Sequence, residues 1–235
     1  MVMELKSYAD KTFGSKKDRI EQANADKMKH RGGWFGLTHL SLEKHFERFK
    51  PMLRSRSPFL AVERDINTCA KMREQARNIN DERVRVEYGD IFDKLFSSCP
   101  SSAFNVICNG IPIYRVPLFR YGHLDFCCTA ATLTEEGIEK QLRRLAKWWA
   151  LKDTFYLEVV VAHRGDRNMV NADVLFKHFI PATFHQLRWE LVDKSITDYK
   201  DTSMMRNAFF EFRREVSWKT RRDLGEKDHY NDGGV

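Results

Sequence analysis

The sequence lacks any run of apolar residues long enough to cross a membrane. The longest such run, residues 155–162, falls far short of the ~20 residues that a transmembrane helix needs. The first residues, Met-Val-Met-Glu-Leu-Lys, contain no apolar segment of the kind that starts a secreted protein, so we expect no signal peptide. Both absences predict a cytoplasmic, intracellular protein with no membrane partner.

Cysteine pairs with metal-binding spacing are also missing. The five cysteines are Cys69, Cys99, Cys108, Cys127 and Cys128, and none forms a C-x-x-C pair. An odd number of unpatterned cysteines agrees with an intracellular location, where thiols stay reduced. We therefore expect no metal site, and we interpret the cysteines as mostly buried thiols.

The composition fits one large folded domain. The chain has 235 residues, of which 42% are hydrophobic, enough to bury a sizeable core. Its 40 Lys and Arg exceed its 33 Asp and Glu, which gives a net charge of +7. The basic residues gather near the two ends: Lys16, Lys17, Arg19, Lys27, Lys29, His30 and Arg31, then Arg213, Arg214, Lys219, Arg221 and Arg222. These segments can bind phosphates, which makes nucleic acid a candidate partner, or they form an ordinary solvated surface.

The apolar pattern predicts strands that alternate with helices as far as residue 180. Ser41 is the expected N-cap of a helix that starts at Leu42, and Asp65 can cap the helix after residues 58–63. Thr132 with Glu135 resembles a capping box, after which one helix is expected to run to about Leu151. The predicted strands are residues 58–63, 84–88, 104–108, 123–128 and 154–162, and residues 189–197 and 208–217 can pair as a hairpin. The fold class is therefore α/β, with a mostly parallel sheet, helices on both faces and a closing antiparallel hairpin.

The same pattern suggests three parts along the chain. Residues 1–30 form an N-terminal arm with a polar helix, and residues 31–218 form the α/β domain. The domain carries an irregular insert near residues 97–121, and residues 219–235 form a charged tail.

Acidic residues stand where the predicted strands end. Glu63 ends the predicted strand at residues 58–63, Gly89 and Asp90 follow the strand at 84–88, and Asp125 lies in the strand at 123–128. The carboxyl ends of parallel strands meet at one edge of a sheet, where ligands bind. A carboxylate such as Glu63 can accept the hydroxyl hydrogens of a ribose. Asp90 can accept from the exocyclic amine of an adenine, which Ile91 would cover.

Each acid also has a structural interpretation. Glu63 can pair with Arg64 or Lys71 at the surface, and Gly89-Asp90 is an ordinary turn followed by a helix cap. Asp125 lies within an apolar strand and is expected to be partly buried. Because burying an unpaired carboxylate costs several kcal/mol, it is the acid least expected to be idle.

Three segments and the terminal hairpin resemble the class I, Rossmann-like S-adenosylmethionine-dependent methyltransferases. The segments are Ala61-Val62-Glu63-Arg64-Asp65, Glu87-Tyr88-Gly89-Asp90-Ile91-Phe92 and Leu124-Asp125-Phe126-Cys127. The resemblance covers residues 34–217, most of the chain. The hairpin distinguishes this family from the dinucleotide-binding dehydrogenases, whose last strands are parallel.

The resemblance implies a cofactor, S-adenosylmethionine, and a set of residues that hold it. Glu63 would bind the ribose, Asp90 and Ile91 the adenine, and Asp125 would lie near the methionine moiety or the methyl acceptor. The expected cofactor-binding residues are Gly36, Thr38, Ser41, Glu63, Arg64, Gly89, Asp90, Ile91, Asp125 and Phe126. The expected catalytic residues are Asp125 and His163, the latter a base near neutral pH or a plain loop residue.

The first loop departs from the family. Its members carry Gly-x-Gly-x-Gly there and often an acid at the end of the first strand, whereas Gly36-Leu37-Thr38-His39-Leu40-Ser41 has one glycine and no acid. Either Thr38 and Ser41 contact the methionine end in another way, or the cofactor is not bound. Some virus- and phage-encoded members look similarly reduced.

The methyl acceptor stays open. The Asp/Asn-Pro-Pro-Tyr/Phe motif of base amino methyltransferases is absent, and Asp125-Phe126-Cys127-Cys128 takes its place. The expected function is methyl transfer from S-adenosylmethionine to a nucleic acid. The choice of nucleic acid as the acceptor rests only on the basic residues near the two ends of the chain. One alternative is a non-catalytic protein of the same fold that binds nucleic acid or protein, such as a viral structural component. Another is a different nucleotide-binding enzyme.

Overall fold

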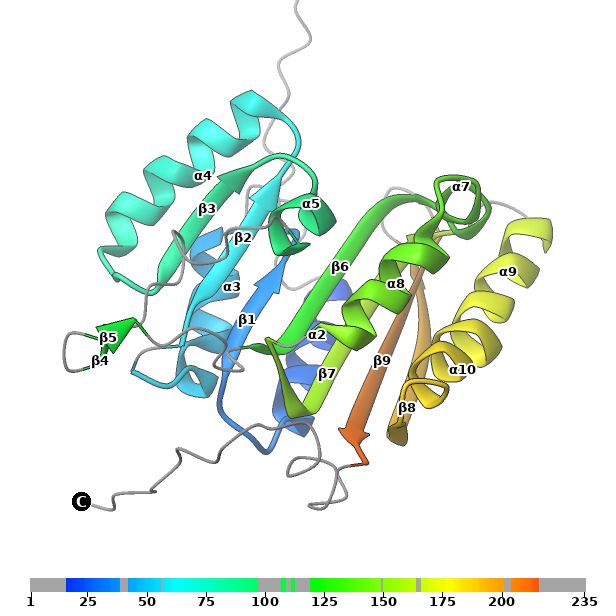
Figure 1. The fold of residues 1–235 in the computed structure, drawn as a ribbon. Helices are drawn as coiled ribbons and strands as arrows, with labels where there is room; N and C mark the ends of the chain where they lie inside the picture. The colour runs from blue at the N-terminus through cyan, green and yellow to red at the C-terminus, as the bar shows by residue number, and fades with distance from the viewer. Residues whose placement is uncertain are drawn as a thin grey trace, which may run out of the picture.

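One seven-stranded sheet organises the protein (Figure 1). The computed structural model describes residues 16–38, 42–55, 57–96, 107–108, 111–112, 119–148, 150–163, 166–200 and 204–215. The sheet contains β1 (Gly33–Gly36), β2 (Phe59–Glu63), β3 (Val84–Tyr88), β6 (Phe119–Thr129), β7 (Leu151–Ala162), β8 (Trp189–Lys200) and β9 (Met204–Arg214). A separate short pair consists of β4 (Ile107–Cys108) and β5 (Ile111–Pro112).

The strand order is β3-β2-β1-β6-β7-β9-β8. The first five strands are parallel, and β9 is antiparallel to both β7 and β8. The predicted mostly parallel sheet and its C-terminal antiparallel hairpin are confirmed. From β1 the chain builds the sheet first toward β3 and then, beginning with β6, in the opposite direction. The order therefore reverses between β1 and β6, which is where ligands bind in open α/β sheets.

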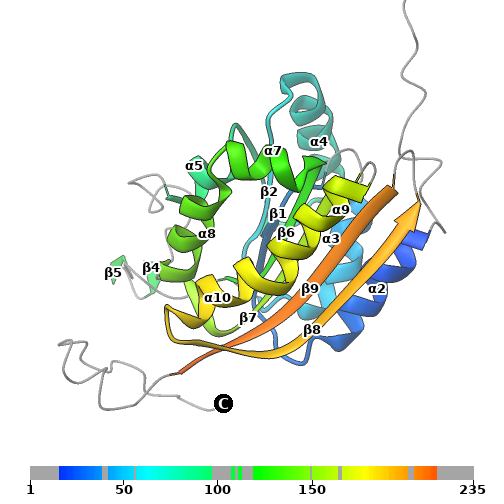
Figure 2. The same ribbon diagram turned by 90° about the vertical axis from the view of Figure 1, so that its right-hand side faces the viewer.

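Helices cover both faces of the sheet, as predicted (Figure 2). One face carries α2 (Lys16–Lys27), α3 (Leu42–Phe49) and α4 (Ile66–Ile79), with a 3-10 turn at Lys50–Met52. The other carries α5 (Ile91–Phe96), α7 (Ala130–Glu135), α8 (Ile138–Lys147), α9 (Asp166–Asp173), a π-helical segment (Val174–Phe179) and α10 (Ile180–His185). Within the described ranges, no helix combines the length and the hydropathy that a membrane crossing requires.

Two apolar clusters form the core, one on each face. Successive strand residues point to opposite faces, so Trp34 and Phe35 of β1 belong to different clusters. Trp34 stacks on Phe59 at 4.2 Å between ring centroids, beneath α3. Phe35 packs with Phe155 in the cluster beneath α8.

Two predicted helix boundaries need correction. The N-cap of α7 is Thr129, whose hydroxyl accepts the backbone N–H of Thr132 at 3.3 Å, so Thr132 lies inside the helix rather than at its cap. The single helix expected after Thr132 is two helices. Gly137, with φ of +78°, lies in the left-handed region and separates α7 from α8.

Several predicted features fall outside the described residues. These are Ser41, the N-terminal arm up to residue 15, most of the insert near residues 97–121, and the tail at 219–235. The helix that Ser41 was expected to cap does begin at Leu42.

Candidate functional site

Gly36 lies at the switch point, at the end of β1. A Cβ atom at this position would stand 2.4 Å from the carbonyl oxygen of His123 and 2.8 Å from the Trp34 ring. The next residue, Leu37, donates its N–H to the same carbonyl at 3.0 Å. The close approach of β1 to β6 therefore requires this glycine, and Thr38 follows it in a buried position.

Glu63 and Arg64 stand at the carboxyl edge, by which we mean the edge where the parallel strands end. Oε1 of Glu63 accepts the N–H of Asp65 at 2.8 Å, and its backbone carbonyl accepts the N–H of Gly89 at 2.9 Å. Arg64 forms an ion pair with Asp90 rather than with Glu63. The structure thus brings together four of the expected cofactor-binding residues.

Asp90 caps α5. Its Oδ1 accepts the N–H groups of Phe92 at 2.8 Å and Asp93 at 3.1 Å, while Arg64 binds Oδ2. Burial would raise the pKa of Asp90, but the hydrogen bond from Arg64 and those two backbone groups lower it. Gly89 before it has φ of +137°, a conformation that favours glycine. The turn-and-cap geometry considered from the sequence is therefore present. Ile91 is buried in the core beside it.

Asp125 is buried beneath α2 and paired with a residue that the sequence did not single out for this role. Lys17 Nζ lies 2.5 Å from Oδ2 of Asp125. Burial would lower the pKa of Lys17, but the negative charges of Asp125 and Glu21 raise it. Phe126 packs instead against the core on the opposite face. Asp125 and Phe126 therefore lie on opposite faces of the sheet.

A polar network continues from Asp125 along the same face of the sheet. Its centre is Glu158, which is 0% exposed in the middle of β7. Oε2 of Glu158 accepts from the Tyr121 hydroxyl at 2.5 Å and lies 2.9 Å from Nδ1 of His123. Oε1 accepts from Nδ2 of Asn24 at 2.7 Å and from Nδ2 of Asn207 at 2.6 Å. We call these five residues the buried polar network.

The charges in the buried polar network support one another. Burial would raise the pKa of Glu158, but the hydrogen bond and charge of His123 lower it to about 2. Burial would lower the pKa of His123, but Glu158 raises it in the same way. Burial and the neighbouring carboxylate of Glu158 raise the pKa of Tyr121. Each member of the pair therefore stabilises the charged form of the other.

α2 and α3 extend the network with further charges. Arg48 of α3 pairs with Asp18 and Glu21 of α2. Glu21 lies 3.9 Å from Nε2 of His45 and 4.0 Å from Nε2 of His123. A helix that looks almost uniformly polar in the sequence thus turns its charged side toward the sheet.

His163, the other expected catalytic residue, belongs to a different group. Its Nε2 lies 3.5 Å from Oδ1 of Asp198, which is paired with Arg206. Arg206 also pairs with Asp173 of α9. Register pairing places Arg206 beside Val161, on the face opposite Asp125. The structure does not bring His163 and Asp125 together, and the catalytic role of each stays a prediction.

Sequence reasoning missed Lys17, Tyr121, His123, Glu158 and Asn207. A signal was present, because Tyr121, His123 and Asp125 alternate along one strand and Glu158 interrupts an apolar run. Period-two alternation places such residues on one face. Within the described ranges, no group of three metal-ligating side chains is placed to hold an ion.

Comparisons with known proteins bear on the fold. No protein-family model matches the chain, and no curated protein matches it. Among solved structures, a Clostridium thermocellum protein provisionally described as an rRNA-methylase aligns with a TM-score of 0.52 at 8% identity, covering 83% of this chain and 96% of that one. This likeness shows that the fold is a Rossmann-like methyltransferase fold.

Two further solved structures align with lower scores. The M. jannaschii protein TYW2, in complex with AdoMet, has a TM-score of 0.49 at 11% identity, covering 88% of this chain and 80% of that one. A Streptococcus mutans protein provisionally described as a methyltransferase, in complex with SAH, has a TM-score of 0.48 at 12% identity, covering 83% and 97%.

Proposed function

We propose that the protein is an S-adenosylmethionine-dependent methyltransferase that acts on nucleic acid. The observation that carries this proposal is the strand order, which reverses between β1 and β6 and brings Glu63, Asp90 and Asp125 to one edge of the sheet. The fold shared with the described rRNA-methylase supports it. We further propose that it is one of the reduced, virus- or phage-encoded members of that family. This part of the proposal rests on residues 36–41, which contain one glycine.

The side chains at the carboxyl edge suit this cofactor. Bound S-adenosylmethionine supplies an electrophilic methyl group on a positively charged sulfur. Glu63 is only partly buried, so its carboxylate can accept hydrogen bonds from ribose hydroxyls. Carboxylates in this region also favour a cationic ligand.

We assign to Asp125 the role of orienting the methyl acceptor. Its pairing with Lys17 favours the ionised carboxylate, which can accept a hydrogen bond from an acceptor amine or hydroxyl. In-line displacement depends mainly on how donor and acceptor are positioned, and Asp125 would orient the acceptor.

Titration calorimetry with S-adenosylmethionine, and separately with S-adenosylhomocysteine, tests the cofactor site. We expect Glu63→Ala to weaken binding about tenfold or more, because a lost hydrogen bond to a charged group is worth about 1.5–3 kcal/mol. Glu74→Ala, an exposed acid on α4, is the matched control and should bind as the wild type does. A folded wild-type chain that binds neither ligand would contradict the proposal.

A second candidate function is a non-catalytic scaffold of the same fold. The specific observation in its favour is that both carboxylate oxygens of Asp90 are already engaged, by Arg64 and by the α5 cap. Asp90→Asn separates the two candidates, since asparagine keeps the cap but loses the charge. Weaker cofactor binding by this variant supports an enzyme, and a wild type without cofactor affinity supports a scaffold.

A further inference from the structure

Basic side chains from five separate segments meet at the amino edge of the sheet, by which we mean the edge where the parallel strands begin. The segments are the α2–β1 link, the turn before β2, the starts of β6 and β7, and the end of β9. They contribute Lys29, His30, Arg31, Arg54, Arg120, Lys152 and Arg213, which we call the amino-edge basic surface.

Arg120 lies at the centre of the amino-edge basic surface. Its Nε donates to the carbonyl of Arg31 at 3.2 Å, and one terminal nitrogen donates to the carbonyl of Thr154 at 2.9 Å. Arg213 faces Thr154 across the β7–β9 register. The two groups that accept from Arg120 are neutral carbonyls. These hydrogen bonds therefore orient its guanidinium without neutralising its charge.

Few acids lie among these cations, so the repulsion between their like charges is only partly offset. Burial lowers the pKa of Lys152, and the charges of Arg120 and Arg54 lower it further. Burial and the charge of Arg120 likewise lower the pKa of His30, together with Arg213 and Lys29. The acids within reach are Asp153 and Glu211. Among the described residues, none of the seven basic side chains is within salt-bridge distance of a carboxylate.

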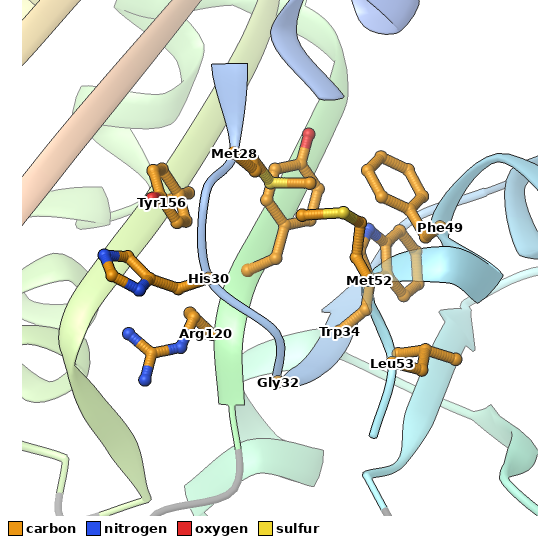
Figure 3. A pocket seen from close by; sticks show the side chains of 10 residues that line it. Met28, His30, Gly32, Trp34, Phe49, Met52, Leu53, Arg120 and Tyr156 are labelled. Atoms are coloured by element: carbon orange, nitrogen blue, oxygen red, sulfur yellow. The ribbon is translucent and has the colours of Figure 1, made fainter. Parts of the chain in front are cut away.

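A narrow recess opens beside this surface (Figure 3). His30 and Arg120 lie on one side of it, and Met28, Met52 and Phe49 on the other. Its lining also includes Trp34, whose buried Nε1 has no hydrogen-bond partner among the described residues. This Nε1 is a donor, which suits an anionic or carbonyl group.

Other basic residues near the N-terminus are engaged elsewhere. Lys17 pairs with Asp125, Lys16 donates to the carbonyl of Asp198, and Lys27 donates to the Ser195 hydroxyl. Arg214 lies over the Trp189 ring, 4.4 Å from its centroid. Apart from Arg19 of α2, the basic residues near the N-terminus that are not engaged in these contacts, Lys29, His30 and Arg31, belong to the amino-edge basic surface.

We propose that the amino-edge basic surface binds the phosphate backbone of a nucleic acid. The identity of the polyanion rests on the proposed function, and the place of binding rests on the cluster of cations and the adjoining recess. Arg120, at the centre of this surface, and Asp125 are five positions apart on β6, so at ~3.3 Å per residue they lie about 17 Å apart along the strand. The surface would therefore hold a substrate several nucleotides away from the methylated one.

Fluorescence anisotropy with a labelled single-stranded RNA of about 20 nucleotides tests this, without S-adenosylmethionine. The test variant is Arg54→Glu with Arg213→Glu, both exposed. The control is Lys71→Glu with Lys140→Glu, which changes the net charge equally on α4 and α8. We expect the test variant to bind at least about tenfold more weakly, and its slope of log affinity against log salt to fall by about 1.4, or 0.7 per phosphate contact.

Three outcomes would overturn this proposal. They are a wild type that does not bind the RNA, a control that loses as much affinity as the test variant, and polyglutamate that binds as tightly as RNA. Because the assay contains no cofactor, its failure leaves the calorimetric test of the methyltransferase site unaffected. Conversely, RNA binding by a chain without cofactor affinity would support the amino-edge surface alone.

Discussion

At the scale of single residues, Gly36 and Gly137 are required for different physical reasons. Gly36 has backbone and ring atoms where a Cβ would stand, whereas a Cβ at Gly137 would meet nothing within 4 Å. Gly137 instead needs a positive φ of 78°. Gly36 is therefore required by packing, and Gly137 by its backbone conformation.

The two alanine variants should differ in cost. We expect Gly36→Ala to lower the free energy of unfolding by about 1–3 kcal/mol or more, because β1 must move away from β6. Gly137→Ala should cost about 1–2 kcal/mol, from the left-handed backbone alone. Urea unfolding measures both. Equal stability of Gly36→Ala and the wild type would show that the strands tolerate the methyl group.

Glu158 should make the stability of the fold depend on acid pH. Its pKa falls from an ordinary 4.5 to about 2 on folding, so its contribution is present above pH ~4.5 and is lost as the pH falls toward 2. We expect Glu158→Gln to flatten this part of the profile of unfolding free energy against pH. Urea unfolding between pH ~3 and ~6 tests it, with the exposed acid Glu190→Gln as control. Parallel profiles for Glu158→Gln and wild type would contradict the assignment.

At the scale of elements, α2 is the unusual one. A helix that is polar on all sides is rarely stable alone in water, and α2 has only 12 residues. It is held by specific polar contacts, in particular those of Asn24 with Glu158 and Asn207. The other helices on this face dock through apolar residues such as Phe46 and Met72. Removing one polar contact should therefore loosen α2 before the rest of the fold.

Asn24→Ala tests this view of α2. We expect it to cost about 1–3 kcal/mol, because the variant removes the Asn24 donor from Oδ1 of Asn207 and one of the two amide donors from Oε1 of Glu158. Amide hydrogen exchange should speed up in α2 more than in β7. The control is Gln22→Ala on the exposed side of the same helix, which removes only a surface hydrogen bond to Asp26 and should leave exchange nearly unchanged. Equal effects of the two variants would mean that the buried contacts do not hold the helix.

At the scale of the whole molecule, the sheet couples two cores and separates two kinds of charge. Both apolar clusters contain residues of the same strands, for example Tyr156 and Phe155 of β7. Acidic Glu63, Asp90 and Asp125 lie toward the carboxyl edge, and the amino-edge basic surface lies at the other. The cofactor and the polyanion are therefore proposed at opposite edges.

The shared sheet predicts cooperative unfolding of both cores. Leu145→Ala, in the cluster beneath α8, should cost about 2–5 kcal/mol through the lost burial and the cavity it leaves. Because the strands are common to both faces, the most protected amides of α3 on the opposite face should lose protection by a similar amount. Hydrogen exchange resolved by segment measures this. Unchanged protection in α3 would show that the two faces unfold separately.

The predictions made from the sequence succeeded where a pattern is local. Asp65 was expected to cap the helix that follows it, and its side chain accepts the N–H of Thr68 at 2.7 Å. The strands at residues 84–88 and the closing hairpin were recognised from alternation. The division at Gly137 was missed, because a positive φ is a property of the folded backbone that an apolar stripe does not reveal.

What the sequence determined by itself is the alternation of strands with helices and the closing hairpin. Both follow from periodicity, which is a property of neighbouring residues. Only the tertiary structure decided which distant residues meet: Lys17 with Asp125, Asn24 with Glu158, and the seven cations of the amino edge. Such partners are separated by tens to more than a hundred positions. Their meeting depends on strand order and helix docking, which no local pattern encodes.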